Sequence, residues 1–230
     1  MSASATPVAL GAARPGLFGF TRAQAAGFLL MLLAIVVLPH LLYPIFLMRI
    51  LTAALFACAF NLMIGYVGLL SFGHAAFYGM GAYVCAWTLK FWHLDAAAAI
   101  LLGGLTGGLL GLALGYLAIR RSGIYFAMIT LALAQMVYFF CLEAPFTGGE
   151  DGIQQVPRGT AFGLFPLHQD MAMYWLVAGI FIAGFLLIHR VIHSPFGQVL
   201  KAIRENEPRA TSLGYRTMHY KLIAFVISTF

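Results

Sequence analysis

The sequence predicts an all-α membrane protein, a polytopic bundle of transmembrane helices with six complete spans and the start of a seventh. Two observations predict this class. Hydrophobic residues make up 62% of the 230 residues and charged residues only 9%, whereas soluble domains contain about 45–50% and about 25%. The few charges are also separated by apolar runs long enough to cross a bilayer. This composition excludes an ordinary cytosolic enzyme, a disordered chain and a disulfide-stapled secreted domain.

The spans are expected in the runs that contain no Asp, Glu, Lys or Arg, because a spanning helix needs roughly 20 apolar residues. These runs hold 26 residues between Arg22 and Arg49, 40 between Arg49 and Lys90, 24 between Asp95 and Arg120, 21 between Arg121 and Glu143, and 19 between Asp170 and Arg190. Nine residues follow Lys221 and begin the seventh span. Residues 1–22 form a tail and residues 23–230 the membrane domain. The first run favours an uncleaved span over a signal peptide, because it exceeds the usual length of about 7–15 residues.

The 40-residue run is expected to break near Gly65–Gly73. The stretch is rich in glycine and also contains Ser71 and His74, and glycine favours turns or close backbone packing. Two spans separated by a turn are therefore predicted, with a re-entrant segment as the alternative.

The positive charges predict the orientation, because Lys and Arg concentrate on the cytoplasmic side of membrane proteins. With six spans, three positive residues fall on one side, namely Arg49, Lys90 and Arg158. Ten fall on the other, namely Arg14, Arg22, Arg120, Arg121, Arg190, Lys201, Arg204, Arg209, Arg216 and Lys221. The N-terminus and the segment from Arg190 to Lys221 are therefore predicted to be cytoplasmic. A single span in the 40-residue run would give nine against four, so charge alone does not fix the span count.

One predicted span has a glycine at every fourth position, at Gly103, Gly107, Gly111 and Gly115. Residues four apart lie on one helix face, and small residues let helices approach closely in lipid. The pattern favours packing within the chain, with a dimer interface as the alternative.

Polar residues inside the predicted spans are few, and none of them is charged. They include Asn61, Ser71, His74, Thr130 and Gln135. Ion-coupled carriers usually place an ionisable group in the membrane, so its absence argues against that class. A packing role is favoured for His74 over a proton relay, and a bond between helices is favoured for Asn61 over substrate binding. The three cysteines, Cys58, Cys85 and Cys141, show no metal-ligand spacing.

The long basic segment is expected to hold two short, capped helices. Ser194 and Pro195 match an N-cap followed by proline, and an apolar stripe follows at Phe196, Val199, Leu200 and Ile203. A second helix starts at Glu207-Pro208, and Gly214 ends it. Spacing alone leaves two interpretations open, a helix lying on the lipid surface and a docking element for a cytoplasmic partner.

Catalytic and nucleotide-binding patterns are missing from the sequence. It contains no GxxxxGK[ST], no HExxH and no arrangement of Ser, His and Asp typical of hydrolases. The Gly-rich acidic stretch from Thr147 to Gly159, on the predicted external side, is either a plain turn or a contact surface for an external partner. We expect no enzyme activity, cofactor, metal or nucleic acid.

Four segments resemble the permease subunits of branched-chain amino-acid ABC importers, specifically the M-type subunit. They are NLMIGYVGLLSFGHAAFYGMGAY (Asn61–Tyr83), RRSGIYFAMITLALAQM (Arg120–Met136), TGGEDGI (Thr147–Ile153) and SPFGQVLKAIRENEPRATSLGY (Ser194–Tyr215). The resemblance covers roughly residues 50–230, and the four segments occur in the family's order.

The resemblance implies a bacterial inner-membrane protein and a set of partners. These are a second permease subunit, two cytoplasmic ATPase subunits and a periplasmic solute-binding protein. It implies a coupling loop (residues 190–221) that docks on the ATPases, with a pattern similar to E-A-A-x-x-x-G. Glu207, Ala210 and Gly214 approximate this pattern, although Pro208-Arg209 breaks its spacing. The docking role carries over to the segment Arg204–Gly214 as a whole, with Arg204, Glu205, Glu207, Ala210 and Gly214 as its candidate coupling residues. The candidate path residues are the polar residues of the predicted spans and their break, namely Asn61, Ser71, His74, Thr130 and Gln135.

The chain differs from the family in length, because such permeases continue well beyond the coupling loop. A chain truncated in its seventh span is therefore expected. The implied mechanism is passive gating, in which the ATPases push on the coupling loop. The alternatives are a urea or short-amide permease of the same class, an ion-coupled carrier working alone, and a structural membrane protein.

Overall fold

The computed structural model describes residues 22–161, 165–167 and 169–230, in two compact units. The first unit ends at Tyr43 and the second runs from Pro44 to Phe230. In the first unit the described structure is one helix, α1 (Arg22–Leu41), which has the length and hydropathy of a membrane span. Most of the tail expected at residues 1–22 lies outside the described residues.

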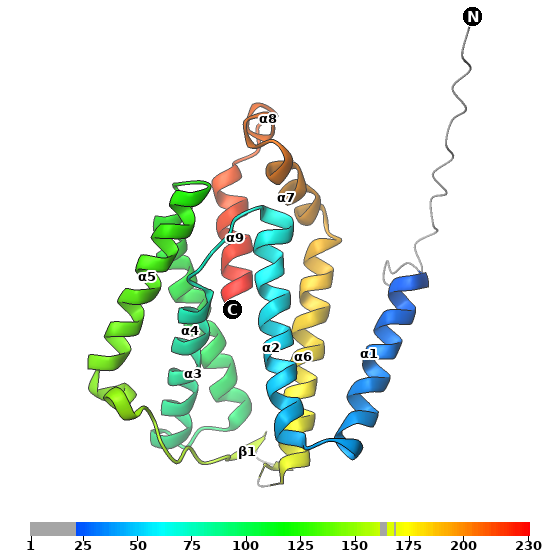
Figure 1. Ribbon diagram of the computed structural model, residues 1–230, viewed down its shortest axis with the longest axis vertical. Helices are drawn as coiled ribbons and strands as arrows, with labels where there is room; N and C mark the ends of the chain where they lie inside the picture. Colours follow the sequence, from blue (N-terminus) through cyan, green and yellow to red (C-terminus); the bar gives the residue numbers. More distant parts are fainter. Residues whose placement is uncertain (1–21, 162–164, 168) are drawn as a thin grey trace, which may run out of the picture. The chain divides into compact units, whose positions relative to one another are not determined.

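The second unit is a helical bundle (Figure 1). Its long helices are α2 (Pro44–Asn61), extended by the π-helix η2 (Leu62–Val67), then α3 (His74–Phe91), α4 (Ala96–Ala118), α5 (Ile124–Glu143) and α6 (Asp170–Ile192). Three shorter helices follow, α7 (Pro195–Glu205), α8 (Glu207–Ser212) and α9 (Thr217–Thr229). Between α5 and α6 lie the 3-10 turns η3 (Pro145–Thr147) and η4 (Gly149–Asp151) and a small antiparallel pair, β1 (Thr160–Ala161) and β2 (Phe165–Pro166). The predicted all-α membrane bundle is confirmed.

Five helical segments of the described chain are long and apolar enough to span a membrane. They are α1, α2 with η2, α4, α5 and α6. Helix α3 is not among them, because His74, Lys90 and several glycines lower its hydropathy. The predicted total of six complete spans therefore stays a prediction.

The predicted break in the 40-residue run lies between η2 and α3. Gly68 caps η2 with φ +78°, a left-handed conformation that glycine adopts without steric cost. Figure 1 shows the connecting segment running back along the bundle before α3 begins. One predicted boundary was wrong, because Arg49 lies inside α2 rather than between two spans. The helix starts at Pro44, whose fixed φ suits a first helical turn.

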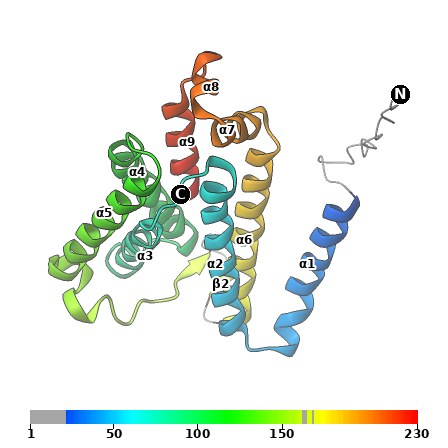
Figure 2. The same ribbon diagram turned by 45° about the horizontal axis from the view of Figure 1, so that its top comes forward.

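The positive charges of the second unit gather at one end of the bundle. Arg120 and Arg121 lie in the turn from α4 to α5, at the same end as α7 and α8 (Figures 1 and 2). Lys90 and Arg158 lie at the opposite end, where Lys90 donates to the carbonyl of Gln154 and Arg158 pairs with Asp170. The two ends therefore differ in charge, as the sequence predicts.

The core lies where α9 meets the other helices. Phe225 of α9 is fully buried, and its ring packs edge-on against Phe77 and Phe126 at centroid distances of 5.5 and 6.2 Å. Met63 of η2 and Leu200 of α7 are also fully buried in this cluster. The core therefore joins the short helices at the charged end to the long helices of the bundle.

Candidate coupling site and candidate path residues

The predicted coupling loop contains the two capped helices that the sequence predicts. The Ser194 side chain accepts a hydrogen bond from the backbone of Gly197 at 3.4 Å, and the Asn206 side chain accepts one from the backbone of Arg209 at 3.1 Å. Leu200 and Ile203, from the predicted apolar stripe, are buried. These caps satisfy backbone donors that the first helical turn leaves unpaired, so α7 and α8 are ordered pieces of the loop.

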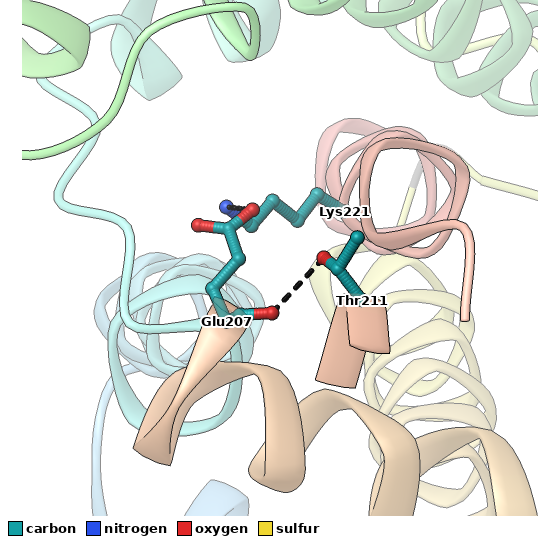
Figure 3. Close-up of polar contacts among 3 residues, drawn as sticks. All are labelled: Glu207, Thr211 and Lys221. Carbon is teal, nitrogen blue, oxygen red and sulfur yellow. Dashed lines mark hydrogen bonds and ion pairs between the residues drawn. The ribbon is translucent and has the colours of Figure 1, made fainter. Parts of the chain in front are cut away.

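Glu207 of α8 is paired with Lys221 of α9, as Figure 3 shows. The Glu207 carboxylate accepts from the Lys221 ammonium at 2.6 Å, and the Glu207 carbonyl accepts from the Thr211 hydroxyl at 3.0 Å. Lys221 is only 5% exposed. The loop was predicted to extend to Lys221. This boundary was wrong, because Lys221 lies in the second turn of α9.

Arg204 of α7 reaches the helix break. Its guanidinium donates to the carbonyl of Gly65 in η2. Its side chain also covers Gly68, where an added Cβ would lie 2.9 Å from the Arg204 Cγ. Nearby, the Lys201 ammonium lies 5.4 Å from the ring centroid of Tyr66. The loop is therefore tied to η2 by two cationic side chains.

The predicted coupling residues face in different directions. Ala210 is 2% exposed and faces the bundle. Gly214 has φ +88° and allows the turn into α9. Glu205 is exposed, together with Arg209 and with Leu213, which is 70% exposed. Glu207 and Ala210 thus meet the chain's own structure, Gly214 shapes the turn, and Glu205, Arg209 and Leu213 are exposed.

His74, one of the predicted path residues, joins three helices. Its Nε2 lies 2.9 Å from the Ser228 hydroxyl of α9, and that hydroxyl donates to the carbonyl of Ala59 in α2 at 2.6 Å. A hydroxyl has one proton to donate, so Nε2 of His74 carries a proton and donates to Ser228. Nδ1 is then an acceptor, and it has no hydrogen-bond partner among the described residues.

Ser71 and Thr130 hold the segment that follows the helix break. The Ser71 hydroxyl accepts from the backbone of Gly73 at 3.3 Å, and the Thr130 hydroxyl accepts from the backbone of Phe72 at 3.2 Å. Both polar side chains are buried. They therefore fix residues 71–73 against α5.

Asn61 and Gln135 differ from the other three predicted path residues because both are exposed. Asn61 ends α2, and Gln135 lies near the middle of α5. Neither side chain makes a hydrogen bond to another described residue. The five predicted path residues therefore form a buried set of three and an exposed pair.

The four glycines of α4 face α3 and α9. A Cβ added at Gly103 would lie 2.7 Å from the carbonyl oxygen of Gly81, and one added at Gly107 would lie 2.7 Å from that of Thr229. A Cβ added at Gly115 would lie 2.7 Å from the Phe225 ring. One added at Gly111 would lie 2.0 Å from the Thr229 hydroxyl. These helices approach so closely that no side chain fits between them.

The described residues thus form helices suited to a multi-pass membrane protein, with an ordered, basic loop at one end of the second unit. Comparison with known proteins identifies the family. Residues 42–230 match the family "Branched-chain amino acid transport system / permease component", and the chain belongs to it.

Among the similar proteins are the high-affinity branched-chain amino acid transport system permease proteins LivM of Salmonella typhimurium and Escherichia coli. Each is 30% identical over 191 residues, which is 73% of this chain and 45% of the relative. A probable branched-chain amino acid transport permease protein LivM of Methanocaldococcus jannaschii is 26% identical over 132 residues, 57% of this chain and 38% of the relative. The chain therefore spans less than half the length of the curated relatives it matches. No solved structure matches.

Proposed function

We propose that the chain is a permease subunit of an ATP-binding-cassette importer and forms part of the translocation path for branched-chain amino acids. The observation that carries this proposal is the coupling loop, two capped helices with an outward face, in a chain of the branched-chain amino acid permease family. The partners proposed are a second permease subunit, two cytoplasmic ATPase subunits and a periplasmic solute-binding protein.

The outward face of α8 is the proposed contact for the ATPase. Leu213 is 70% exposed directly after α8, and Glu205 and Arg209 of the same loop are also exposed. An apolar centre with a polar rim is the usual anatomy of a protein–protein interface. This arrangement favours docking over a helix lying flat in the lipid, because the apolar residues of α7, Leu200 and Ile203, are already buried in the bundle.

The exposed amides mark the proposed translocation path. An amide that faces hydrocarbon without a partner is costly, so the faces of Asn61 and Gln135 are proposed to meet water in the path or the second permease. Ser71, His74 and Thr130 are proposed to support the wall of the path from inside. The exposed acids Glu150 and Asp151, at the opposite end from α8, are proposed to meet the binding protein.

Docking is tested by replacing Leu213. We expect Leu213→Asp to lower co-purification of the ATPases with the full-length protein by about tenfold or more, because an interface hot spot contributes at least about 2 kcal/mol. Leu213→Met keeps an apolar side chain of similar volume and is the matched control. Unchanged co-purification of the Asp variant would argue against this docking face.

The substrate and energy source are tested by reconstituting the four kinds of subunit in liposomes. ATP-dependent uptake of labelled leucine is expected. Uptake of labelled urea in place of leucine would move the protein to the urea and amide class. Uptake by the single chain driven by an ion gradient, without ATP, would overturn the proposal in favour of an ion-coupled carrier.

A further inference from the structure

Lys221 places a positive charge inside the protein, in the second turn of α9. Lys221 is 5% exposed, and Ala224 and Phe225, one turn further along α9, are fully buried. An ammonium group taken out of water needs an opposite charge and hydrogen-bond acceptors. Within the described parts of the chain, the carboxylate within ion-pair distance is that of Glu207, at 2.6 Å.

Glu207 is presented to Lys221 by a rigid piece of the coupling loop. The Asn206 cap orders the first turn of α8, and so does the bond from the Thr211 hydroxyl to the Glu207 carbonyl, which Figure 3 shows. Ala210, one turn later, is buried on the same side. Since α8 has only six residues, the Glu207–Lys221 ion pair is a substantial part of what holds it to α9.

The far end of α9 is anchored inside the bundle on the same helix face. Ser228 follows Lys221 by seven residues, which is two helical turns. Its hydroxyl meets His74 of α3 and the carbonyl of Ala59 in α2. One face of α9 therefore contacts the coupling loop at one end and the predicted path residue His74 at the other.

We infer that Lys221 is a positioning residue for coupling, and that its pair with Glu207 transmits the displacement of α8 to α9. Glu207, in this arrangement, acts inside the permease and does not touch the ATPase. The inference rests on the proposed function, because it names how the docked loop moves the bundle.

The experiment compares Glu207→Gln, Lys221→Met and the reversed pair, Glu207→Lys with Lys221→Glu, in the reconstituted importer. Glu143→Gln, the same chemical change at an exposed site at the opposite end of the bundle, is the matched control. We expect the single variants to co-purify normally with the ATPases, while leucine import per ATP hydrolysed falls about tenfold. The reversed pair should recover most of this loss. Loss of ATPase co-purification, unchanged import per ATP, or no recovery in the reversed pair would each overturn the inference.

A second measurement does not depend on the ATPases. Hydrogen exchange of the amides at residues 209–215 is followed in the full-length chain in lipid nanodiscs. Both single variants should exchange faster than the wild type, and the reversed pair should regain protection. Unchanged hydrogen exchange in the variants would overturn the inference, whether or not the wild-type importer is active. An inactive wild-type importer would count against the proposed function alone. If a single variant does not fold, the reversed pair decides: a folded reversed pair supports the Glu207–Lys221 pairing, and an unfolded one contradicts it.

Discussion

At the scale of single residues, the glycines of α4 are required because atoms of α3 and α9 occupy the space that a side chain would need. At Gly107 the obstacle is the carbonyl oxygen of Thr229, which belongs to the backbone of α9 and cannot rotate away. Between helices in lipid there is little hydrophobic drive, so such close contact provides much of the attraction. The absence of a side chain at Gly107 therefore stabilises the pairing of α4 with α9.

We predict that Gly107→Ala destabilises the protein by about 1–3 kcal/mol, the usual cost of overpacking. The matched control is Gly179→Ala in α6, where an added Cβ meets nothing within 4 Å. Thermal unfolding in detergent, followed by size-exclusion chromatography, measures both. Equal melting temperatures for the two variants would contradict the close packing at Gly107.

At the scale of elements, α9 is joined to α2 and α3 through the hydrogen bonds of Ser228. We predict that Ser228→Ala lowers the free energy of unfolding by about 1–3 kcal/mol, because it leaves the buried Nε2 proton of His74 unpaired. In a His74→Leu background the same change should cost less, since the unpaired donor is then gone. Unfolding of the two single variants and the double variant measures the difference. Additive costs would show that the two side chains act independently.

The sequence could predict those elements whose signals are local. The cap at Ser194, the helix start at Glu207-Pro208 and the stop at Gly214 occur within a few residues of the helices that they bound. The partners of the polar side chains could not be predicted, because Arg204 and Gly65 are 139 residues apart and His74 and Ser228 are 154 apart. Spacing likewise indicated a close-packed face on α4, but not which helices meet it.

At the scale of the whole molecule, the positive charges distinguish the two ends of the second unit. Lys and Arg concentrate on the cytoplasmic side of membrane proteins, so the end that carries α7 and α8 is expected inside the cell. The exposed acids of the loop between α5 and α6 would then lie outside. Both assignments follow from one orientation, so a single labelling experiment tests them together.

We predict that Glu150→Cys reacts with a membrane-impermeant maleimide on intact spheroplasts, whereas Thr211→Cys reacts only after permeabilisation. Both positions are exposed, so access from one side decides the result. The native cysteines, Cys58, Cys85 and Cys141, are replaced by alanine beforehand. The reverse pattern of labelling would invert the proposed orientation.

The π-helix η2 also limits which changes of chain length the protein can tolerate. A π turn contains an extra residue relative to an α turn. This π-helix contains the Gly65 carbonyl that Arg204 binds, and it precedes the left-handed Gly68. Deleting one residue between Leu62 and Val67 would restore ordinary α-helical phase and rotate the following residues by about 100°. Such a deletion would turn the exit of the chain away from α7. We therefore expect the protein to tolerate conservative substitutions in η2 better than insertions or deletions.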